Sequence, residues 1–334
     1  MRIIRKDITN KEVNFMSKNI WKDGIMGLVV GDALGLPVQF YDRDELKSNP
    51  VTKMEGDGTF NLPKGSWSDD SSLAIATLES IRRNNEIIAE DVMDNFVKWL
   101  YDGVFTPYGQ AYDIGETCEY AIENYKEERN IDTCGKVGER ANGNGGLMRI
   151  MPVCLYAYKN EKNGGFAEKD AVDIVHKLTA ITHNHKRACI ASGMYYFMVK
   201  AILEHCGNLT EVLQFGIDNA MRYYGKDSNN YEELGYYKRL FYLNKFVDTK
   251  EDEIKSTGYV LDSLEAAVWC LINTDSYKDC LLKAVNLGDD ADTVGAIAGG
   301  LAGLYYGYDL IPDEWLEAIV KREWIEELCN EQVN

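Results

Sequence analysis

The sequence lacks the cysteine patterns that stabilise small secreted domains or hold a structural zinc ion. It contains eight cysteines but no CxxC motif. They are scattered at Cys118, Cys134, Cys154, Cys189, Cys206, Cys270, Cys280 and Cys329. This pattern argues against a zinc site and a disulfide framework, so we expect buried, reduced thiols in a reducing compartment.

An apolar secretory core is also missing from the N-terminus. Residues 1–18 read "MRIIRKDITNKEVNFMSK", which is a charged segment and not the apolar run of a signal peptide. The sequence therefore predicts a cytoplasmic protein. Because Met16 offers a second possible start, we interpret residues 1–17 as a polar extension ahead of a folded domain over residues 18–334.

Proline-rich linkers are absent, since the chain has only six prolines and no Ser/Pro-rich stretch. Nothing in the sequence therefore marks a domain boundary. Of the 334 residues, 45% are hydrophobic and 27% are charged, which is enough apolar material for one large core. We predict a single compact domain.

Basic side chains are in deficit, with 36 Lys and Arg against 54 Asp and Glu, and the net charge is -18. A chain this acidic repels a phosphate backbone, which argues against a nucleic-acid partner. Long apolar runs are missing too. The segment "TVGAIAGGLAGLYYG" is shorter than the roughly 20 apolar residues of a membrane span, and Asp292 and Asp309 bracket it. We predict no membrane partner either.

Strand-like alternation is scarce outside residues 51–60, whereas apolar residues recur mostly at helical spacing. The pattern predicts an all-α fold. The expected helices cover residues 18–35, 70–83, 89–101, 110–126, 168–182, 187–205, 210–222, 229–245, 260–272, 276–286, 292–307 and 314–328.

Two of these expected helices carry glycine at every fourth position. The first has Gly27, Gly31 and Gly35, and the second has Gly295, Gly299, Gly303 and Gly307. Glycine inside a helix costs about 1 kcal/mol relative to alanine, so a stripe of glycines needs a compensating contact. Close approach of two backbones provides that contact. We predict that these two helices pair at the centre of the molecule.

Two segments gather carboxylates and hydroxyls at predicted helix starts. "SWSDDSS" supplies Ser68, Asp69 and Asp70, and "GDDADT" supplies Asp290, Asp292 and Thr293. Helix capping explains about one residue of each set, because capping side chains accept from free backbone N–H groups. The other carboxylates repel one another unless a cation lies between them, and Mg²⁺ and Mn²⁺ favour such oxygens. We predict that the fold joins both sets around a pair of ions about 3.5 to 4 Å apart.

Five motifs between Trp21 and Tyr308 resemble, in order, those of the ADP-ribosylglycohydrolase family, which includes the dinitrogenase-reductase-activating glycohydrolases. They are "GLVVGDALGLPVQF", "GSWSDDSSLAIATLESI", "NGGLMRIMPV", "ITHNHKRA" and "NLGDDADTVGAIAGGLAGLYYG". The resemblance implies an all-α domain with a metal cleft among its central helices and two Mg²⁺ or Mn²⁺ ions. It also implies hydrolysis of the bond between ADP-ribose and an acceptor, which is a modified protein side chain or a small molecule.

The resemblance assigns roles to individual residues. It implies metal ligands at Ser68, Asp69, Asp70, Asp290, Asp292 and Thr293, with Asp70 or Asp290 as the catalytic base. It implies substrate contacts at Asp32, Gln39, Asn144, Gly145, Gly146 and His183. We expect Arg149 to brace the glycine loop or pair with a carboxylate, and His185 to face elsewhere, with no zinc motif around the two histidines. Tyr108 and Tyr112 are candidates for stacking on adenine.

Gln39 departs from the resemblance, because many family members have glutamate at this position. Glutamine accepts no proton at neutral pH but still hydrogen-bonds a hydroxyl or a water. Three alternatives to the hydrolase therefore stay open, namely a noncatalytic ADP-ribose or nucleotide binder, a structural protein, and a hydrolase of another nucleotide-like substrate. The sequence does not predict the acceptor, the choice between Mg²⁺ and Mn²⁺, or the oligomeric state.

Overall fold

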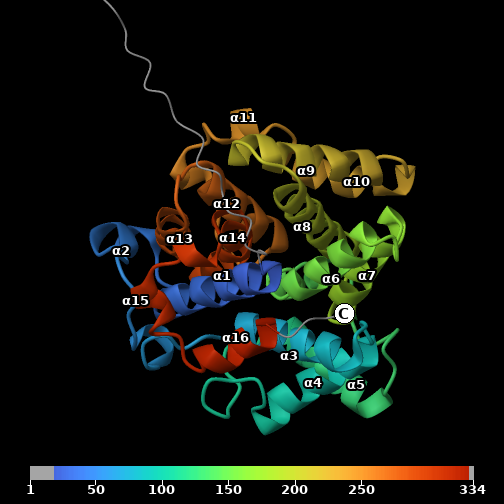
Figure 1. The fold of residues 1–334 in the computed structure, drawn as a ribbon, viewed down its shortest axis with the longest axis horizontal. Coiled ribbons are helices and arrows are strands. Elements are labelled where there is room, and N and C mark those ends of the chain that lie inside the picture. Colours follow the sequence, from blue (N-terminus) through green and yellow to red (C-terminus); the bar gives the residue numbers. More distant parts are fainter. Residues whose placement is uncertain (1–18, 331–334) are drawn as a thin grey trace, which may run out of the picture.

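Helices form nearly all the regular structure of residues 19–330, the part of the chain that the computed structural model describes (Figure 1). They are α1 (Ile20–Gly35), α2 (Arg43–Ser48), α3 (Asp69–Asn84), α4 (Ala89–Asp102), α5 (Glu116–Glu128), α6 (Met151–Lys162), α7 (Glu168–Ala180), α8 (Lys186–Glu204), α9 (Leu209–Tyr224), α10 (Tyr231–Leu234), α11 (Leu243–Phe246), α12 (Val260–Ile272), α13 (Tyr277–Val285), α14 (Ala291–Tyr306), α15 (Asp313–Leu316) and α16 (Arg322–Asn330). The short strands β1 (Lys136–Val137) and β2 (His183–Asn184) pair in parallel. The prediction of an all-α fold is confirmed, while the predicted extension over residues 1–17 lies outside the described residues.

The glycine stripes of α1 and α14 face each other at the centre of the molecule, where the two helices lie side by side (Figure 1). A Cβ atom on Gly31 would lie 2.1 Å from the carbonyl oxygen of Gly295, and one on Gly27 would lie 2.4 Å from that of Gly299. Any side chain there would push the backbones apart, so the predicted central pair is confirmed. Gly307 does not share in it, because it ends α14 with φ +92° and a Cβ there would meet nothing.

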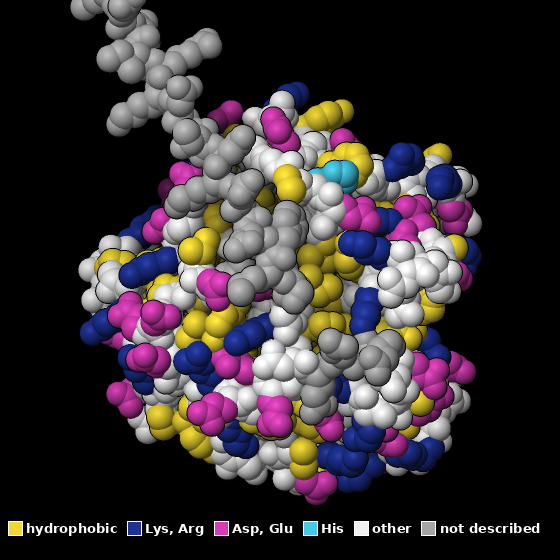
Figure 2. Space-filling model, viewed as in Figure 1, with side chains coloured by type: hydrophobic (Ala, Val, Ile, Leu, Met, Phe, Trp, Pro, Cys, Tyr) yellow, Lys and Arg dark blue, Asp and Glu magenta, His cyan; other side chains and the backbone are white. Residues whose placement is uncertain are grey.

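The remaining helices pack around this pair and leave the start of α14 near the start of α3. The helices α12, α13 and α8 contact α14, while α3, α6 and α16 contact α1. In Figure 1, α3, α4 and α5 gather on one side of α1 and α8, α9 and α10 on the other. Acidic and basic side chains are interspersed over the face in Figure 2, so the net charge does not form a single patch on that face.

Several predicted helix boundaries were wrong for local reasons. Helices α2 and α6 are missing from the expected helices, and in α6 Pro152 lies in the first turn, where a helix accepts proline. The expected helix over 110–126 begins only at Glu116, since residues 110–115 form a loop. The expected helix over 229–245 is divided into α10, a 3₁₀ helix over Gly235–Phe241 and α11, and the one over 314–328 is interrupted between α15 and α16. Residues 51–60 form no strand and contribute an isolated bridge between Asp57 and Leu62 and a 3₁₀ helix over Gly58–Phe60.

The cysteines are free, as expected, but not all are buried. Six lie in the interior, whereas Cys189 is half-buried and Cys206 is exposed, which corrects the expectation for these two. None of the helices within residues 19–330 combines the length and the apolar character that a bilayer crossing requires.

Candidate active site

The first carboxylate segment (Ser68, Asp69 and Asp70) is held at the start of α3 by Asp32 of α1. The Asp32 carboxylate accepts from the backbone N–H groups of Ser68 and Ser71 at 3.0 Å and from the Ser71 hydroxyl at 2.5 Å. Asp32 is fully buried, and its hydrogen bonds fix where the segment begins. Its predicted contact with substrate stays a prediction.

The second carboxylate segment (Asp290, Asp292 and Thr293) begins α14 and meets the first. The Thr293 hydroxyl donates to Asp70 Oδ2 at 3.3 Å, and the Ser68 hydroxyl donates to the same oxygen at 3.1 Å. The structure thus brings together side chains that lie more than 200 positions apart in the chain. The glycine seam, by which we mean the close contact between the glycine stripes of α1 and α14, positions the second segment. A Cβ on Gly35 would lie 2.5 Å from the Asp292 backbone nitrogen.

Amide side chains orient the outer carboxylates of the site. The Asn144 amide donates to Asp290 Oδ2 at 2.6 Å and to the Ser263 hydroxyl at 2.9 Å. The Gln39 amide donates to Asp113 Oδ2 at 2.8 Å and, more weakly, to Asp290 Oδ1 at 3.5 Å. Gln39 therefore links two carboxylates that would otherwise only repel each other.

Asp113 is a site residue that the sequence analysis missed. It belongs to the loop before α5 and has φ +55°, a left-handed conformation that aspartate adopts more readily than most residues. The expected helix over 110–126 placed it inside a helix and hid this role. A signal was available in "DIGET", where an aspartate precedes a glycine that directly starts a helix.

The carboxyl groups of the site are buried and raise one another's pKa. Burial raises the pKa of Asp70 well above its usual range, and the charges of Asp32 and Asp290 raise it further. Burial and then the charge of Asp70 raise the pKa of Asp292, and burial comes first for Asp69 as well. Burial also raises the pKa of Asp32 to about 7, against the opposing effect of its hydrogen bonds from Ser71 and Ser68. A bound cation would offset both causes.

Several buried oxygens of the site lack a hydrogen-bond partner within residues 19–330, namely Asp70 Oδ1, Asp292 Oδ2 and Gln39 Oε1. Buried polar atoms are nearly always paired, because an unpaired one carries its full desolvation cost. Carboxylate, hydroxyl and amide oxygens are ligands of hard divalent ions. The donor set of the two carboxylate segments therefore fits Mg²⁺ or Mn²⁺.

A cleft of about 250 Å³ opens beside these groups, and Gln39 lines it while Asp70 and Asp292 do not. It is lined by Gln39, Phe40, Asp69, Asp113, Gly115, Glu116, Thr117, Cys118, Gly143, Asn144, Gly145, Met148, His183, Gly258, Asp290 and Thr293. Helix α5 points its N-terminus at the cleft, and its N-cap Gly115 offers no side chain to its first N–H groups. A helix start of this kind favours anions. The exposed Tyr108 and the Tyr112 hydroxyl, which donates to the Trp67 carbonyl, do not line the cleft.

The predicted glycine loop packs tightly against His183. A Cβ on Gly145 would lie 2.9 Å from His183 Cε1, and one on Gly146 would lie 2.9 Å from Thr179 Cγ2. His183 is buried and hydrogen-bonds Thr182 through Nδ1 at 2.9 Å. Burial, followed by the positive charge of Arg149, lowers its pKa to about 3. His183 is therefore a neutral wall of the cleft.

Arg149 braces this wall and does not line the cleft. It is fully buried and donates to the Leu178 carbonyl at 2.9 Å and to the Thr182 hydroxyl at 2.8 Å. Burial lowers its pKa to about 10. We expected Arg149 either to brace the glycine loop or to pair with a carboxylate, and these contacts agree with bracing.

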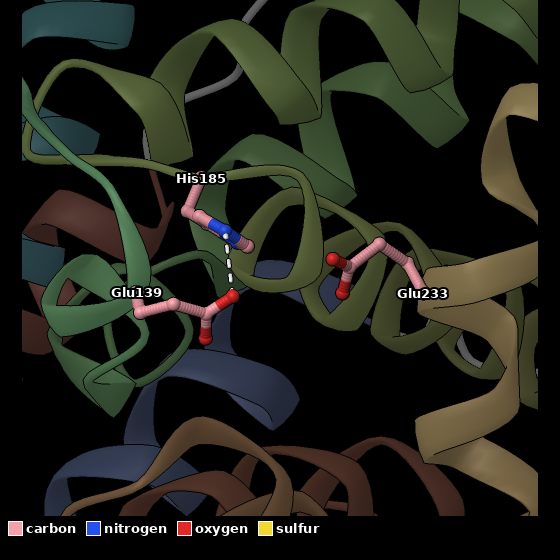
Figure 3. Close-up of side chains that lie close together, drawn as sticks. All are labelled: Glu139, His185 and Glu233. Atoms are coloured by element: carbon pink, nitrogen blue, oxygen red, sulfur yellow. Dashed lines mark ion pairs between the residues drawn. The ribbon is translucent and has the colours of Figure 1, made fainter.

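A second group of possible ligands lies outside the cleft around His185. Glu139, His185 and Glu233 each offer one atom within 4.8 Å of the others (Figure 3). However, Arg187 pairs with Glu139 at 3.0 Å and with Glu233 at 2.8 Å. His185 Nδ1 accepts from the Arg187 backbone, so the proton of the neutral ring lies on Nε2, 3.7 Å from Glu139. With its ligand atoms engaged in this way, the group fits a metal less well than the carboxylate segments do.

These features define a class of helical proteins in which buried carboxylates, gathered at the end of a glycine-paired helix core, offer metal-binding oxygens beside a cleft. The sequence profile of ADP-ribosylglycohydrolase matches residues 19–334, and the chain belongs to this family, which confirms the resemblance.

Relatives support the same placement. The chain is 32% identical to "ADP-ribosylarginine hydrolase Tri1" of Serratia proteamaculans (strain 568), covering 93% of this chain and 78% of that protein. It is 30% identical to "ADP-ribosyl-[dinitrogen reductase] glycohydrolase" of Rhodospirillum rubrum, covering 89% and 90%. A solved structure, "ADP-ribosylglycohydrolase-related protein complex", superposes with a TM-score of 0.75 at 30% identity over 93% of this chain and 96% of that one.

Proposed function

We propose that this protein is a metal-dependent hydrolase that cleaves the bond between ADP-ribose and an arginine side chain. The observation that carries the proposal is the set of buried carboxylate oxygens without partners, Asp70 Oδ1 and Asp292 Oδ2, beside a cleft. Family membership and the arginine-directed relative support the substrate.

The six side chains of the two carboxylate segments would hold two Mg²⁺ or Mn²⁺ ions, and Gln39 Oε1 is free to accept from a water beside them. When bound, such ions lower the pKa of a coordinated water and stabilise negative charge. The unpaired oxygens are what such ions would satisfy.

The residues around the reacting water hold it and take its proton. Asp290 is fixed by Asn144 and Gln39, whose amides donate to its two oxygens. We assign proton acceptance to Asp290 or Asp70, with Asp113 held nearby by Gln39. The water oxygen attacks the anomeric carbon, the bond to the acceptor nitrogen breaks, and the accepted proton passes to the leaving guanidine.

The other end of the cleft suits the diphosphate. The first N–H groups of α5, at Glu116 and Thr117, face the cleft without a side-chain cap. Glycines at 143 and 145 allow close approach from the opposite loop. Backbone donors explain how a protein with a net charge of -18 binds an anionic ligand.

The alternative of a noncatalytic binder rests on Gln39. Its amide donates to Asp113 and Asp290, and a glutamate there would bring a further negative charge against both. In this site the glutamine amide thus holds two carboxylates in place without adding a charge, which favours the enzyme.

Release of free ADP-ribose from arginine-linked, serine-linked and small-molecule conjugates tests the proposal. We expect release from the arginine conjugate with Mg²⁺ or Mn²⁺ and none with chelator. A protein that binds ADP-ribose and releases nothing from any conjugate would instead be the noncatalytic binder.

A further inference from the structure

Phe40, at the mouth of the cleft, is strained and exposed at once. Its φ of +67° is a left-handed conformation that is rare for a bulky residue. The residue is 62% exposed. Such an outlier persists only where surrounding contacts impose it, and it often marks a ligand contact.

The contacts that impose this conformation come from both sides of the site. The Phe40 backbone N–H donates to the Asp289 carbonyl at 2.6 Å, and the Thr59 hydroxyl donates to the Gln39 carbonyl at 2.5 Å. The turn directs the Gln39 side chain inward to Asp113 and leaves the Phe40 ring outside. The strain therefore holds the ring at the mouth.

A second cavity of about 440 Å³ adjoins the cleft at Phe40. Phe40 lines both spaces. Residues adjacent in sequence line different spaces, since Asp290 and Gly258 line the cleft while Asp289 and Thr257 line the second cavity. The second cavity has no wall from the glycine loop, His183 or the start of α5. Phe40 is the residue that both linings share, next to Gln39, whose amide reaches Asp290.

Charge in the second cavity favours a cationic occupant. Arg43 is engaged with the backbone carbonyls of Leu287, Glu251 and Ile254, and Lys47 pairs with Asp252 at 2.7 Å. Four carboxylates (Asp42, Asp44, Asp252 and Asp289) line the second cavity against three basic side chains (Arg43, Lys47 and Lys255), so the lining carries a net negative charge.

We infer that Phe40 and the second cavity form the acceptor subsite, in which the planar arginine guanidinium of the substrate stacks on the Phe40 ring near Asp289. This inference rests on the proposed function and deepens it. A guanidinium stacks on an aromatic face and gains from nearby carboxylates, whereas a serine acceptor has no flat cation to place there. Phe40 is then a specificity determinant and takes no proton.

The test compares Phe40→Asn with Phe40→Trp. Asparagine tolerates the left-handed conformation, so Phe40→Asn removes the ring without adding strain, while tryptophan keeps an aromatic face. We expect Phe40→Asn to raise KM for an ADP-ribosylated arginine peptide about tenfold, with kcat and the Kd of free ADP-ribose unchanged. Phe40→Trp should stay close to wild type. Tyr242→Asn removes an equally exposed ring (62%) elsewhere and serves as the control.

An unchanged KM in Phe40→Asn would overturn the inference, and so would an equal loss of affinity for free ADP-ribose, which would place the ring on ADP-ribose itself. If wild type binds the peptide conjugate without cleaving it, the proposed hydrolysis fails. The acceptor subsite is then judged by the Kd of the intact conjugate. A loss of about tenfold in Phe40→Asn, relative to free ADP-ribose, would support it, and no loss would overturn it.

Discussion

Helix α14 contains two regions with opposite needs. Along its length, glycines pack backbone to backbone against α1, and this seam is complete without any ligand. At its start, Asp292 lies near Asp70 of α3, and both carboxyl groups are buried with an unpartnered oxygen and a raised pKa. Gly35 joins the regions, since its contact with Asp292 belongs to the seam and positions the site. The close packing of the seam stabilises the fold, and this stabilisation offsets the desolvation and repulsion of the buried carboxylates at the site.

The largest expected effect is the loss of turnover in the site. Asp70→Asn or Asp290→Asn should lower kcat/KM at least about 10³-fold, because the metal set and the proton acceptor are lost together. The melting temperature of the metal-free protein should not fall, since each change removes a buried like charge.

The control for these variants is Gln39→Ala, which leaves every carboxylate in place. We expect a smaller loss for it, about tenfold, from the lost hydrogen bonds to Asp113 and Asp290. A Gln39→Ala enzyme as inactive as Asp290→Asn would show that the amide itself takes part in the reaction.

The next effect is on the seam. Gly31→Ala should lower the free energy of unfolding by about 3 kcal/mol, because its Cβ would lie 2.1 Å from a backbone oxygen that cannot move alone. Urea denaturation measures it. Gly235→Ala is the matched control, since a Cβ there meets nothing within 4 Å and its φ is not positive. Equal stability of the two variants would contradict the close contact of α1 and α14.

Metal binding should then stabilise the carboxylate site, which is the region of α14 that lacks its ligand. Mg²⁺ or Mn²⁺ at about 100 times its Kd should stabilise the fold by about 2.7 kcal/mol, because the ions bind only the assembled carboxylates. Thermal unfolding with and without chelator measures the gain. Asp292→Asn should lose most of it and Gly235→Ala none, whereas a gain retained in Asp292→Asn would place the ions elsewhere.

Much of this comparison could be predicted from the sequence, because its signals are local. The glycine spacing indicated the seam, and the types of Ser68, Asp70 and Thr293 indicated a site for hard cations. Asp113 and Phe40 escaped because tertiary contacts define them. Asp113 is a site residue through Gln39, 74 positions away, and Phe40 takes its conformation from the Asp289 carbonyl. Neither contact leaves a periodic trace in the chain.

The smallest expected effect is the pH dependence of the metal-free protein. The folded pKa values of Asp70, Asp292 and Asp32 (about 7) lie above the unfolded value of about 3.9. The native state therefore binds more protons than the unfolded state between these values, and stability falls as the pH rises through this window. The buried His176 and His183, with pKa lowered to about 4 and about 3, act in the opposite direction below about pH 6.5.

Comparing wild type with Asp70→Asn isolates the carboxylate contribution, because both proteins keep the two histidines. Between pH 5 and pH 7.5, the metal-free wild type should lose more stability with rising pH than Asp70→Asn does. Saturating metal should reverse the wild-type slope, because protons then compete with the ions for the same oxygens. Parallel curves for the two metal-free proteins would mean that Asp70 is not one of the buried carboxyl groups with a raised pKa. The contrast between the glycine contact, which is complete, and the carboxylate site, which lacks its ligand, would then depend on Asp292.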